Sequence, residues 1–214
     1  MQENMDAITI NVGEVMETKE NQKQSRTMER KNLNQSIILV RWSKDLARSI
    51  ARSFCYMALK LKLKEIGSSI HCDGKISITG TKNIKIGNGC FFGKNVQLQT
   101  RGRGYIHLGE KVKIGKSVIL NSFFNITVED NTYIGEGVVI QDLHSESEKE
   151  LSQKEGKPIY IGKDVWIGKG AQIHAGVTIG HGCTISANSV VLHSIPPRVI
   201  AGGSPAKVIK ENGN

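Results

Sequence analysis

The chain has few aromatic residues, no long apolar run and no closely spaced cysteines. Phe, Trp and Tyr make up only 5% of its 214 residues, which argues against a core built on large aromatic side chains. No stretch approaches the roughly 20 apolar residues of a transmembrane helix. The first thirty residues are polar and lack the apolar segment of a secretory signal. These absences predict a cytoplasmic protein.

The cysteine spacing and the charge pattern exclude several kinds of partner. No two cysteines form a C-x-x-C pair, which excludes the common zinc and thioredoxin-like motifs and fits a reducing compartment. The net charge of +9 would suit nucleic acid, anionic lipid or a phosphorylated small molecule. The chain has no zinc-finger spacing, no aromatic stacking set and no sustained Lys/Arg run. We therefore expect no nucleic-acid partner.

The N-terminal third divides into a polar tail and a basic helix. Residues 1–36 show no sustained periodicity and are expected to be a mobile tail. Residues 37–66 are expected to contain an amphipathic helix over 44–65, with Ser43 as its N-cap and Gly67 as its stop. Its apolar positions step by three or four: Leu46, Ile50, Phe54, Met57 and Leu61. The polar side carries Arg48, Arg52, Lys60, Lys62 and Lys64.

This helix has two possible roles. Solenoids need a terminal cap because an unfinished coil exposes apolar edges, and the apolar face could supply one. Alternatively, a basic helix of low hydrophobic content can dock on a membrane surface. The first role predicts a buried apolar face, and the second predicts an exposed face at the inner side of the membrane.

The strongest signal is a six-residue period after residue 66. Apolar residues recur at Ile161, Ile167, Ile173, Ile179, Ile185 and Val191. The fifth position of each block is small or β-branched: Val165, Ala171, Val177, Cys183 and Ser189. Three earlier runs keep the same phase: Ile86, Phe92 and Leu98; Leu108, Ile114 and Leu120; Val128, Ile134 and Ile140. Three sixes complete one eighteen-residue coil.

A period of six fits neither an α-helix nor a hairpin meander, and it is typical of the hexapeptide repeat of a parallel β-helix. We expect one inward apolar residue per short strand and a glycine at each corner. The steps of 10, 8 and 21 residues between runs predict protruding loops of about 4, 2 and 15 extra residues, the longest over 145–160. The alternative, a β-sandwich of short strands, would not keep this phase through six blocks.

The chain resembles the hexapeptide-repeat acyltransferases, in particular the galactoside, maltose and bacterial polysaccharide O-acetyltransferases. The resemblance covers roughly residues 66–210. It rests on D-x-H at 142–144, on PIYIGKDVWIGKGAQIHAGVTIG at 158–180 and on IPPRVIAGGSPAKVIK at 195–210. It implies an all-β fold, a left-handed parallel β-helix of hexapeptide repeats over 67–210, working as a homotrimer.

His144 is the candidate catalytic base. It follows the third run at a coil edge, before the long insert, and could equally be a solvated loop histidine. Acyl transfer to an alcohol needs a base, and histidine suits that task at neutral pH. The resemblance implies that His144 is catalytic, because the family's histidine falls in this motif. Asp142 could orient its imidazole, although a backbone carbonyl could do the same.

Trp166 is expected to point outward from its repeat, since the equivalent positions hold Gln172, Thr178, Thr184 and Val190. An outward tryptophan could be a subunit contact. The resemblance instead implies that it lies beside the thiol end of coenzyme A.

The resemblance implies further contacts to acetyl-CoA. Lys207 and Lys210 would lie near the phosphates, where positive charge is favourable, although a solvated charge pair is the common alternative. Other contacts map to Lys169, Ala187, Leu192 and His193, of which the last two replace side chains that are more polar in the family. Asn121 matches a position that contacts the acceptor sugar, and its alternative is an asparagine ladder inside the coil.

We expect no metal site. His71, His107, His174 and His181 are interpreted as repeat-surface residues, and the seven-residue spacing of the last two does not match the zinc hydratases of this fold. The expected reaction is direct transfer of acetyl from acetyl-CoA to a saccharide hydroxyl in a ternary complex, with each coenzyme lying between neighbouring subunits. Two alternatives remain: an N-acetyltransferase acting on an amino or nucleotide sugar, and a non-catalytic β-helix scaffold.

Overall fold

The computed structural model describes residues 56–57, 59–143 and 156–211. Contacts between residues divide the chain into two units, Met1–Ser49 and Ile50–Asn214, and the first lies wholly outside the described residues. The predicted tail, most of the predicted helix, His144 and most of the loop over 145–160 also lie outside them.

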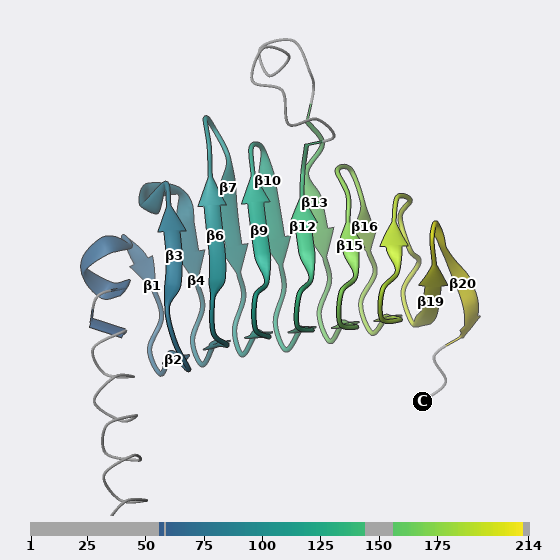
Figure 1. The fold of residues 1–214 in the computed structure, drawn as a ribbon, viewed down its shortest axis with the longest axis horizontal. Coiled ribbons are helices and arrows are strands. Elements are labelled where there is room, and N and C mark those ends of the chain that lie inside the picture. Colours follow the sequence, from purple (N-terminus) through teal and green to yellow (C-terminus); the bar gives the residue numbers. More distant parts are fainter. Residues whose placement is uncertain (1–55, 58, 144–155, 212–214) are drawn as a thin grey trace, which may run out of the picture. The chain divides into compact units, whose positions relative to one another are not determined.

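Three β-sheets run along the second unit (Figure 1). Sheet A contains, in spatial order, β1 (Glu65–Ile66), β4 (Ile84–Ile86), β7 (Tyr105–Leu108), β10 (Asn125–Val128), β13 (Ile159–Ile161) and β16 (Thr178–Ile179). Sheet B contains β2 (His71–Cys72), β5 (Phe91–Phe92), β8 (Lys113–Ile114), β11 (Tyr133–Ile134), β14 (Trp166–Ile167), β17 (Thr184–Ile185), β19 (Val199–Gly203) and β20 (Ala206–Glu211). Sheet C contains β3 (Ile76–Thr79), β6 (Val96–Thr100), β9 (Ile119–Ser122), β12 (Val139–Gln141), β15 (Gln172–Ile173) and β18 (Val190–Val191).

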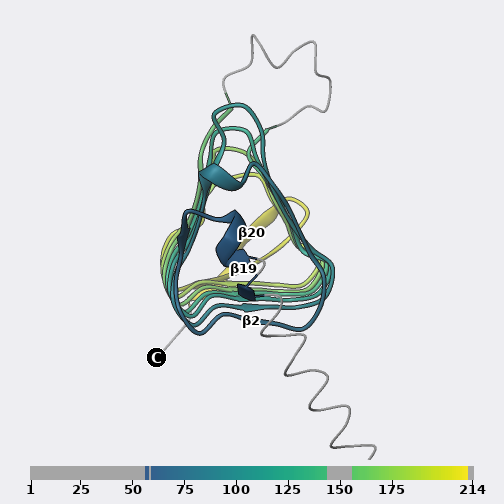
Figure 2. The same cartoon turned by 90° about the vertical axis from the view of Figure 1, so that its left-hand side faces the viewer.

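The strand order confirms the predicted parallel β-helix. Neighbours within a sheet are parallel and come from successive coils, as in the pairing of Tyr133 with Trp166 and of Trp166 with Thr184. The three sheets form the sides of a triangle when viewed along the coil axis (Figure 2). The last pair, β19 and β20, is antiparallel and closes the C-terminal end as a hairpin.

The residues with a period of six fill the interior, as predicted. From Ile86 to Val191, each is at most 2% exposed. The small fifth-position residues are buried as well, from Val165 to Ser189. Each repeat of the later coils therefore sends two side chains inward rather than the one expected. The second must be small or β-branched because it shares the interior with the larger one.

Glycine makes only some of the corners. The left-handed corner position is Gly137 in one coil and Gly170 in the next, but Asn95 and Asn188 hold the same conformation elsewhere. Asparagine tolerates this region better than most residues, so the expectation of a glycine at every corner was too strict. At Gly135, close approach is the reason for glycine, since a Cβ would lie 2.7 Å from the backbone nitrogen of Lys169.

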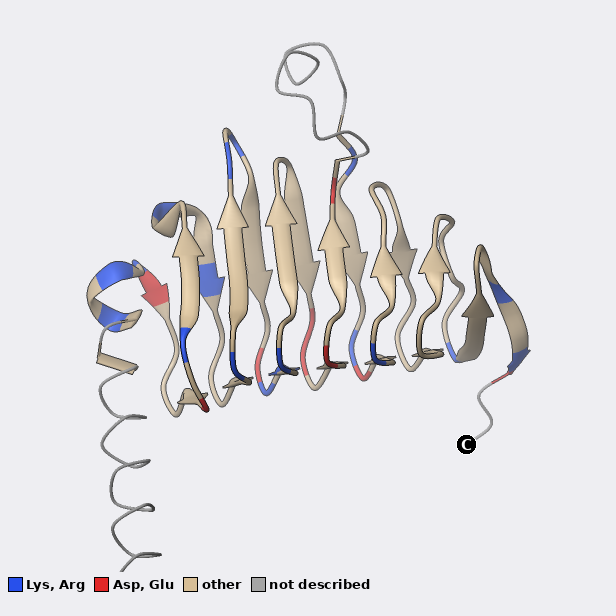
Figure 3. Cartoon of the chain, viewed as in Figure 1, with Lys and Arg blue, Asp and Glu red and all other residues tan. Residues whose placement is uncertain are grey.

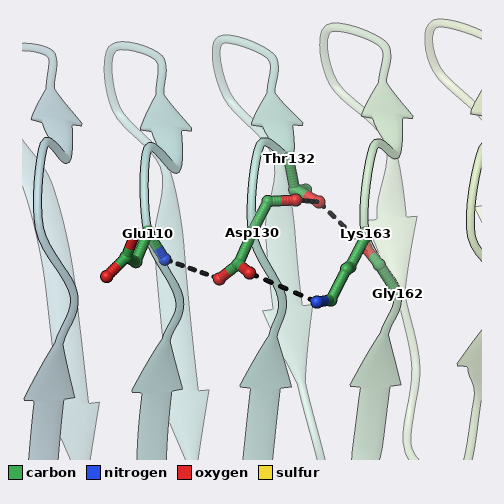
Figure 4. A network of polar contacts seen from close by, with 5 residues as sticks. All are labelled: Glu110, Asp130, Thr132, Gly162 and Lys163. Carbon is green, nitrogen blue, oxygen red and sulfur yellow. Dashed lines mark hydrogen bonds and ion pairs between the residues drawn. The ribbon is translucent and has the colours of Figure 1, made fainter.

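Many charged residues lie at the corners between sheets (Figure 3). Between sheets A and B, the backbone N–H of Glu110 donates to Asp130 Oδ1 at 2.8 Å, and Lys163 Nζ lies 3.4 Å from Asp130 Oδ2 (Figure 4). Thr132 Oγ1 donates to the carbonyl oxygen of Gly162 at 2.9 Å. The Glu110 N–H is the main cause of a lowered pKa for Asp130, with Lys163 contributing. These contacts tie three successive coils together along one edge.

The first two insertions between repeat runs lengthen strands more than they make loops. The first extra residues are taken up by β6 and β7, which leaves a turn over 101–104, and a short 3-10 helix, η1 (Thr81–Asn83), occupies the same edge one coil earlier. The second insertion leaves only residues 123–124 between β9 and β10. All of these insertions fall where sheet C gives way to sheet A, which we call the C–A edge.

The described end of the N-terminal helix covers the first coil, but not with the face that was predicted. Residues 56–57 and 59–62 are helical. Leu59 and Leu63 are buried with the core, whereas Met57 and Leu61 are 59% and 83% exposed. Leu59, Leu61 and Leu63 alternate, so the sequence offers two apolar stripes. The structure buries the stripe with Leu59 and Leu63 and not the predicted one with Met57 and Leu61. Within the described residues, no helix is long and apolar enough to cross a membrane.

Candidate active site

The predicted coenzyme residues Trp166, Lys207 and Lys210 share the outer face of sheet B. Trp166 is 53% exposed and precedes the inward Ile167. Its parallel neighbour is Thr184, which pairs with Ile200, and Ile200 pairs in turn with Lys210. Paired residues lie on the same face of a sheet. Three strand spacings of about 4.8 Å therefore separate Trp166 from Lys210, roughly 14 Å in all.

A bulge decides that both terminal lysines face the same way. Lys207 pairs with Gly202 and Lys210 pairs with Ile200, while the register shifts between Ile200 and Ala201. In a regular strand, residues three apart point to opposite faces, but one extra residue restores the same side. The expected pair of phosphate-binding lysines is therefore placed on one face by a feature that strand periodicity alone would not reveal.

Lys169 and Ala187 lie on the corner between sheets B and C, next to this face. The backbone N–H of Asn188 donates to the carbonyl of Lys169 at 2.8 Å, so the two corner turns stack directly. Lys169 Nζ is 3.6 Å from Glu136 Oε2, and both side chains are largely exposed. An exposed pair of this kind contributes little to stability. The Lys169 ammonium therefore remains accessible to an anionic ligand.

Asp142 lies on the C–A edge and is buried. Its Oδ1 accepts the backbone N–H of Phe123 at 2.7 Å, and its Oδ2 accepts the N–H of Phe124 and the hydroxyl of Ser122, each at 2.9 Å. The carboxylate thus holds the turn of the preceding coil. His144 lies outside the described residues, so an interaction between Asp142 and its imidazole stays a prediction.

Asn121 occupies the outer face of sheet C, so a ladder inside the coil was the wrong alternative. Its in-register neighbours are Gln99 and Gln141, while Leu120 and Ser122 on either side are buried. Asn121 Oδ1 is a buried atom without a hydrogen-bond partner among the described residues. An unsatisfied buried oxygen is costly. A contact to an acceptor stays a prediction.

Leu192 and His193 do not lie beside Trp166. They follow β18 of sheet C, at the C–A edge, and both are exposed. Within one chain, the candidate site therefore has two parts. A donor face comprises Trp166, Lys169, Ala187, Lys207 and Lys210, and the C–A edge carries Asn121, Asp142, Leu192 and His193, with His144 next in sequence after residue 143.

The sequence analysis missed one residue on the donor face. The ring of Tyr133 stacks on Trp166, with centroids 4.1 Å apart and an interplanar angle of 24°. Tyr133 immediately precedes the inward Ile134, as Trp166 precedes Ile167. The shared phase could have indicated this pair, but the long insert between the two repeats hid it.

The remaining polar groups of the described residues do not form a metal site. Among residues 56–57, 59–143 and 156–211, no group of three His, Cys, Asp or Glu side chains could hold an ion. His71 and His181 are exposed, and His107 and His174 are half-buried on the repeat surface. A cavity of about 370 Å³ lies over the first strands of sheet C, lined by Lys75, Ser77, Asn95, Val96 and Gln97.

Comparison with known proteins identifies the family. The model described as bacterial transferase hexapeptide (six repeats) matches residues 158–193, and the hexapeptide repeat of succinyl-transferase matches residues 83–122. WbbJ of Escherichia coli (strain K12), whose name assigns it to O-acetyl transfer in lipopolysaccharide biosynthesis, is 30% identical over 141 residues, which are 60% of this chain and 72% of WbbJ. The chain belongs to the hexapeptide-repeat acyltransferases.

Solved structures agree with this placement. The hexapeptide-repeat acetyltransferase VCA0836 of Vibrio cholerae is 25% identical, with a TM-score of 0.54 over 76% of this chain and 82% of that one. VCA0836 has also been solved with acetyl coenzyme A. Galactoside acetyltransferase in complex with coenzyme A is 25% identical, with a TM-score of 0.50 over 72% and 68% of the chains. AntD, an N-acyltransferase of Bacillus cereus, is 20% identical with a TM-score of 0.65 over 74% and 88%, and shares the fold.

Proposed function

We propose that this acyltransferase moves acetyl from acetyl-CoA to a hydroxyl group of a saccharide, in the biosynthesis of a bacterial surface polysaccharide or lipopolysaccharide. The observation that carries this proposal is the donor face, where an exposed tryptophan and two lysines share one side of sheet B, with Lys210 in the same cross-strand row as Trp166. The similarity to WbbJ supports O-acetylation. The VCA0836 and galactoside acetyltransferase complexes support coenzyme A as the carrier.

The donor face suits an extended anionic cofactor. The phosphates of acetyl-CoA would lie near Lys207 and Lys210, where charge-assisted hydrogen bonds are strong. The pantetheine arm would run toward Trp166, which presents an apolar wall to the thioester. Backbone contacts at Lys169 and Ala187 would line the corner beside this face.

The division of the candidate site supports a homotrimeric enzyme. The donor face lies on sheet B and its corner, whereas Asn121 and Asp142 lie on the C–A edge of the same chain. One chain does not bring the two parts together. A neighbouring copy, turned about a common axis, would place its C–A edge against this donor face, so that His144 of one subunit faces Trp166 of the next.

The proposed reaction has a single chemical transfer. The acceptor oxygen attacks the thioester carbonyl carbon while its proton passes to the imidazole of His144. The C–S bond then breaks, and the imidazolium returns the proton to the thiolate, which gives the acetyl ester and free coenzyme A. Backbone N–H groups at corner glycines would stabilise the oxyanion. Asn121 would contact the acceptor saccharide.

The described cysteines do not suit an acyl-enzyme. Cys72, Cys90 and Cys183 are buried. Burial raises the pKa of Cys90 to about 11, and burial also raises the pKa of Cys183. A thiol with a raised pKa is a poor nucleophile, because only the thiolate attacks a carbonyl carbon. A ternary complex is therefore the simpler mechanism.

An N-acetyltransferase acting on an amino or nucleotide sugar is the second candidate. The fold shared with AntD, crystallised with dTDP and 3-hydroxybutyryl-CoA, favours it. Both candidates would use the same donor face and would differ at the acceptor.

Thiol release from acetyl-CoA should be measured against a panel of neutral saccharides and amino sugars, with the acetyl group then located by NMR. We expect an ester that mild base removes. An amide product would favour the second candidate, and absence of thiol release would favour a non-catalytic scaffold.

We also propose that the enzyme works in the cytoplasm and that its N-terminal helix contacts the inner face of the membrane through the exposed stripe. Met57 and Leu61 are exposed beside Lys60, Lys62 and Lys64. Leu61→Ala should weaken co-sedimentation with anionic vesicles and leave the melting temperature unchanged. The matched variant Leu63→Ala should lower the melting temperature and leave co-sedimentation unchanged. Truncation of a buried leucine to alanine costs about 2–5 kcal/mol of stability. Equal vesicle binding by wild type and Leu61→Ala would contradict the membrane contact.

A further inference from the structure

The stack of Tyr133 on Trp166 is the most specific aromatic contact on the donor face. The two residues are in-register neighbours on the parallel strands β11 and β14, and their rings lie nearly parallel. Tyr133 is half-buried, whereas Trp166 is largely exposed. An exposed tryptophan without a neighbour would sample several staggered rotamers. The Tyr133 ring favours the one rotamer in which the two faces meet.

The stack leaves the indole with one free face. Tyr133 covers the side of Trp166 that looks toward β8 and the N-terminal coils. The opposite side looks toward Thr184 on β17, and beyond it toward Ile200 and Lys210. A flat ligand group or an apolar chain can therefore stack on the indole from the C-terminal side.

We propose that Tyr133 is a positioning residue, which holds the Trp166 indole with its free face toward Thr184 so that the acyl–pantetheine end of acyl-CoA binds between the indole and the C-terminal hairpin. This inference rests on the proposed function, and it adds a residue and a direction to the donor site. Tyr133 itself need not touch the coenzyme. Its contribution is to order the indole before binding, which reduces the entropy lost when the ligand binds.

The effect should appear in KM rather than in kcat. The indole contacts the carrier in the ground state and in the transition state alike, so loss of its orientation weakens uniform binding. An aromatic pair of this geometry contributes an amount that corresponds to about a 2- to 12-fold change in an equilibrium constant. The KM for acetyl-CoA should therefore rise within that range when the ring of Tyr133 is removed.

The test uses the full-length chain with Trp42→Phe, so that Trp166 is the single tryptophan. In this parent, Tyr133→Leu and Tyr133→Thr should shift the Trp166 emission and raise both the acetyl-CoA KM and the dissociation constant measured without acceptor. Tyr133→Phe keeps the ring and should have the Trp166 emission, the KM and the dissociation constant of the parent. Phe91→Leu, an aromatic replacement in the same outer row of sheet B two strands away, is the matched control and should leave them unchanged. The threonine variant keeps a strand-forming residue should the leucine variant fold poorly.

Two results overturn the inference. One is acetyl-CoA binding by both Tyr133→Leu and Tyr133→Thr that equals the parent, with unchanged Trp166 emission. The other is a Tyr133→Phe variant as impaired as the leucine variant, which would assign the effect to the hydroxyl instead of the ring. If the parent itself fails to bind acetyl-CoA, the proposed function fails, and the emission of the variants still reports whether Tyr133 orients the indole.

Discussion

The outer face of sheet B and the C–A edge differ in regularity although the same coils build both. From β2 to β17, every strand of sheet B is two residues long, and none of the insertions interrupts it. At the C–A edge, strands range up to the five residues of β6, and the insertions and the long segment before residue 156 all fall there. One side of the molecule is therefore constant, and the other varies from coil to coil.

This difference matches the two parts of the candidate site. A carrier such as acetyl-CoA is the same molecule in every reaction, and a constant face suits it. An acceptor differs from enzyme to enzyme, and the variable edge offers turns and inserts that can change without disturbing the interior. Under the proposed function, the donor face binds the carrier and the C–A edge binds the saccharide.

The largest expected effect tests the chemistry assigned to the C–A edge. His144→Ala should lower kcat by about 10²- to 10⁴-fold, the usual contribution of a positioned acid–base group. The melting temperature and the oligomeric state should not change. The control is His181→Ala, which removes an exposed corner histidine and should keep full activity. Near-normal turnover by His144→Ala would refute the assignment.

Asp142→Ala separates a structural role from a catalytic one at the same edge. Loss of the carboxylate leaves the backbone N–H groups of Phe123 and Phe124 without their acceptor, whereas the Ser122 hydroxyl can still donate to the carbonyl oxygen of Tyr105. We expect a loss of about 2–4 kcal/mol in the free energy of unfolding, measured by urea denaturation. The neighbouring outward residue, as Gln141→Ala, should change it by less than about 0.5 kcal/mol. A variant with unchanged stability but reduced kcat would show that Asp142 serves His144 instead.

The smallest effect tests the donor face. Replacement of both Lys207 and Lys210 by alanine should raise the KM for acetyl-CoA by about tenfold, since charge-assisted hydrogen bonds contribute more than neutral ones. The kcat should change little, because these side chains are far from the thioester. Lys113→Ala and Lys116→Ala together remove the same charge from earlier coils and serve as the control. Equal KM values in the two double variants would show that the terminal lysines are solvated charges and do not bind acetyl-CoA.

The fold could be predicted from the sequence because a local rule governs it. A side chain in a flat strand points either into the coil or out of it, so the period of six assigned the interior residues from Ile86 to Val191 without any knowledge of contacts. The same rule placed Trp166 outside. The steps of three or four residues used for the N-terminal helix selected the wrong face, because Leu59, Leu61 and Leu63 offer two apolar stripes and packing against the first coil selects one.

What only the tertiary structure decided is which outward residues meet. Coil stacking fixes those neighbours, and the insertions make the sequence distance between stacked residues irregular. Tyr133 and Trp166 stack although a long insert separates their repeats, and a bulge turns Lys207 and Lys210 to one face against the alternation of a regular strand. The sequence by itself determined the coil and the residues that point away from it. The register between coils, a non-local property, decided how those residues are grouped into a donor face and a separate C–A edge.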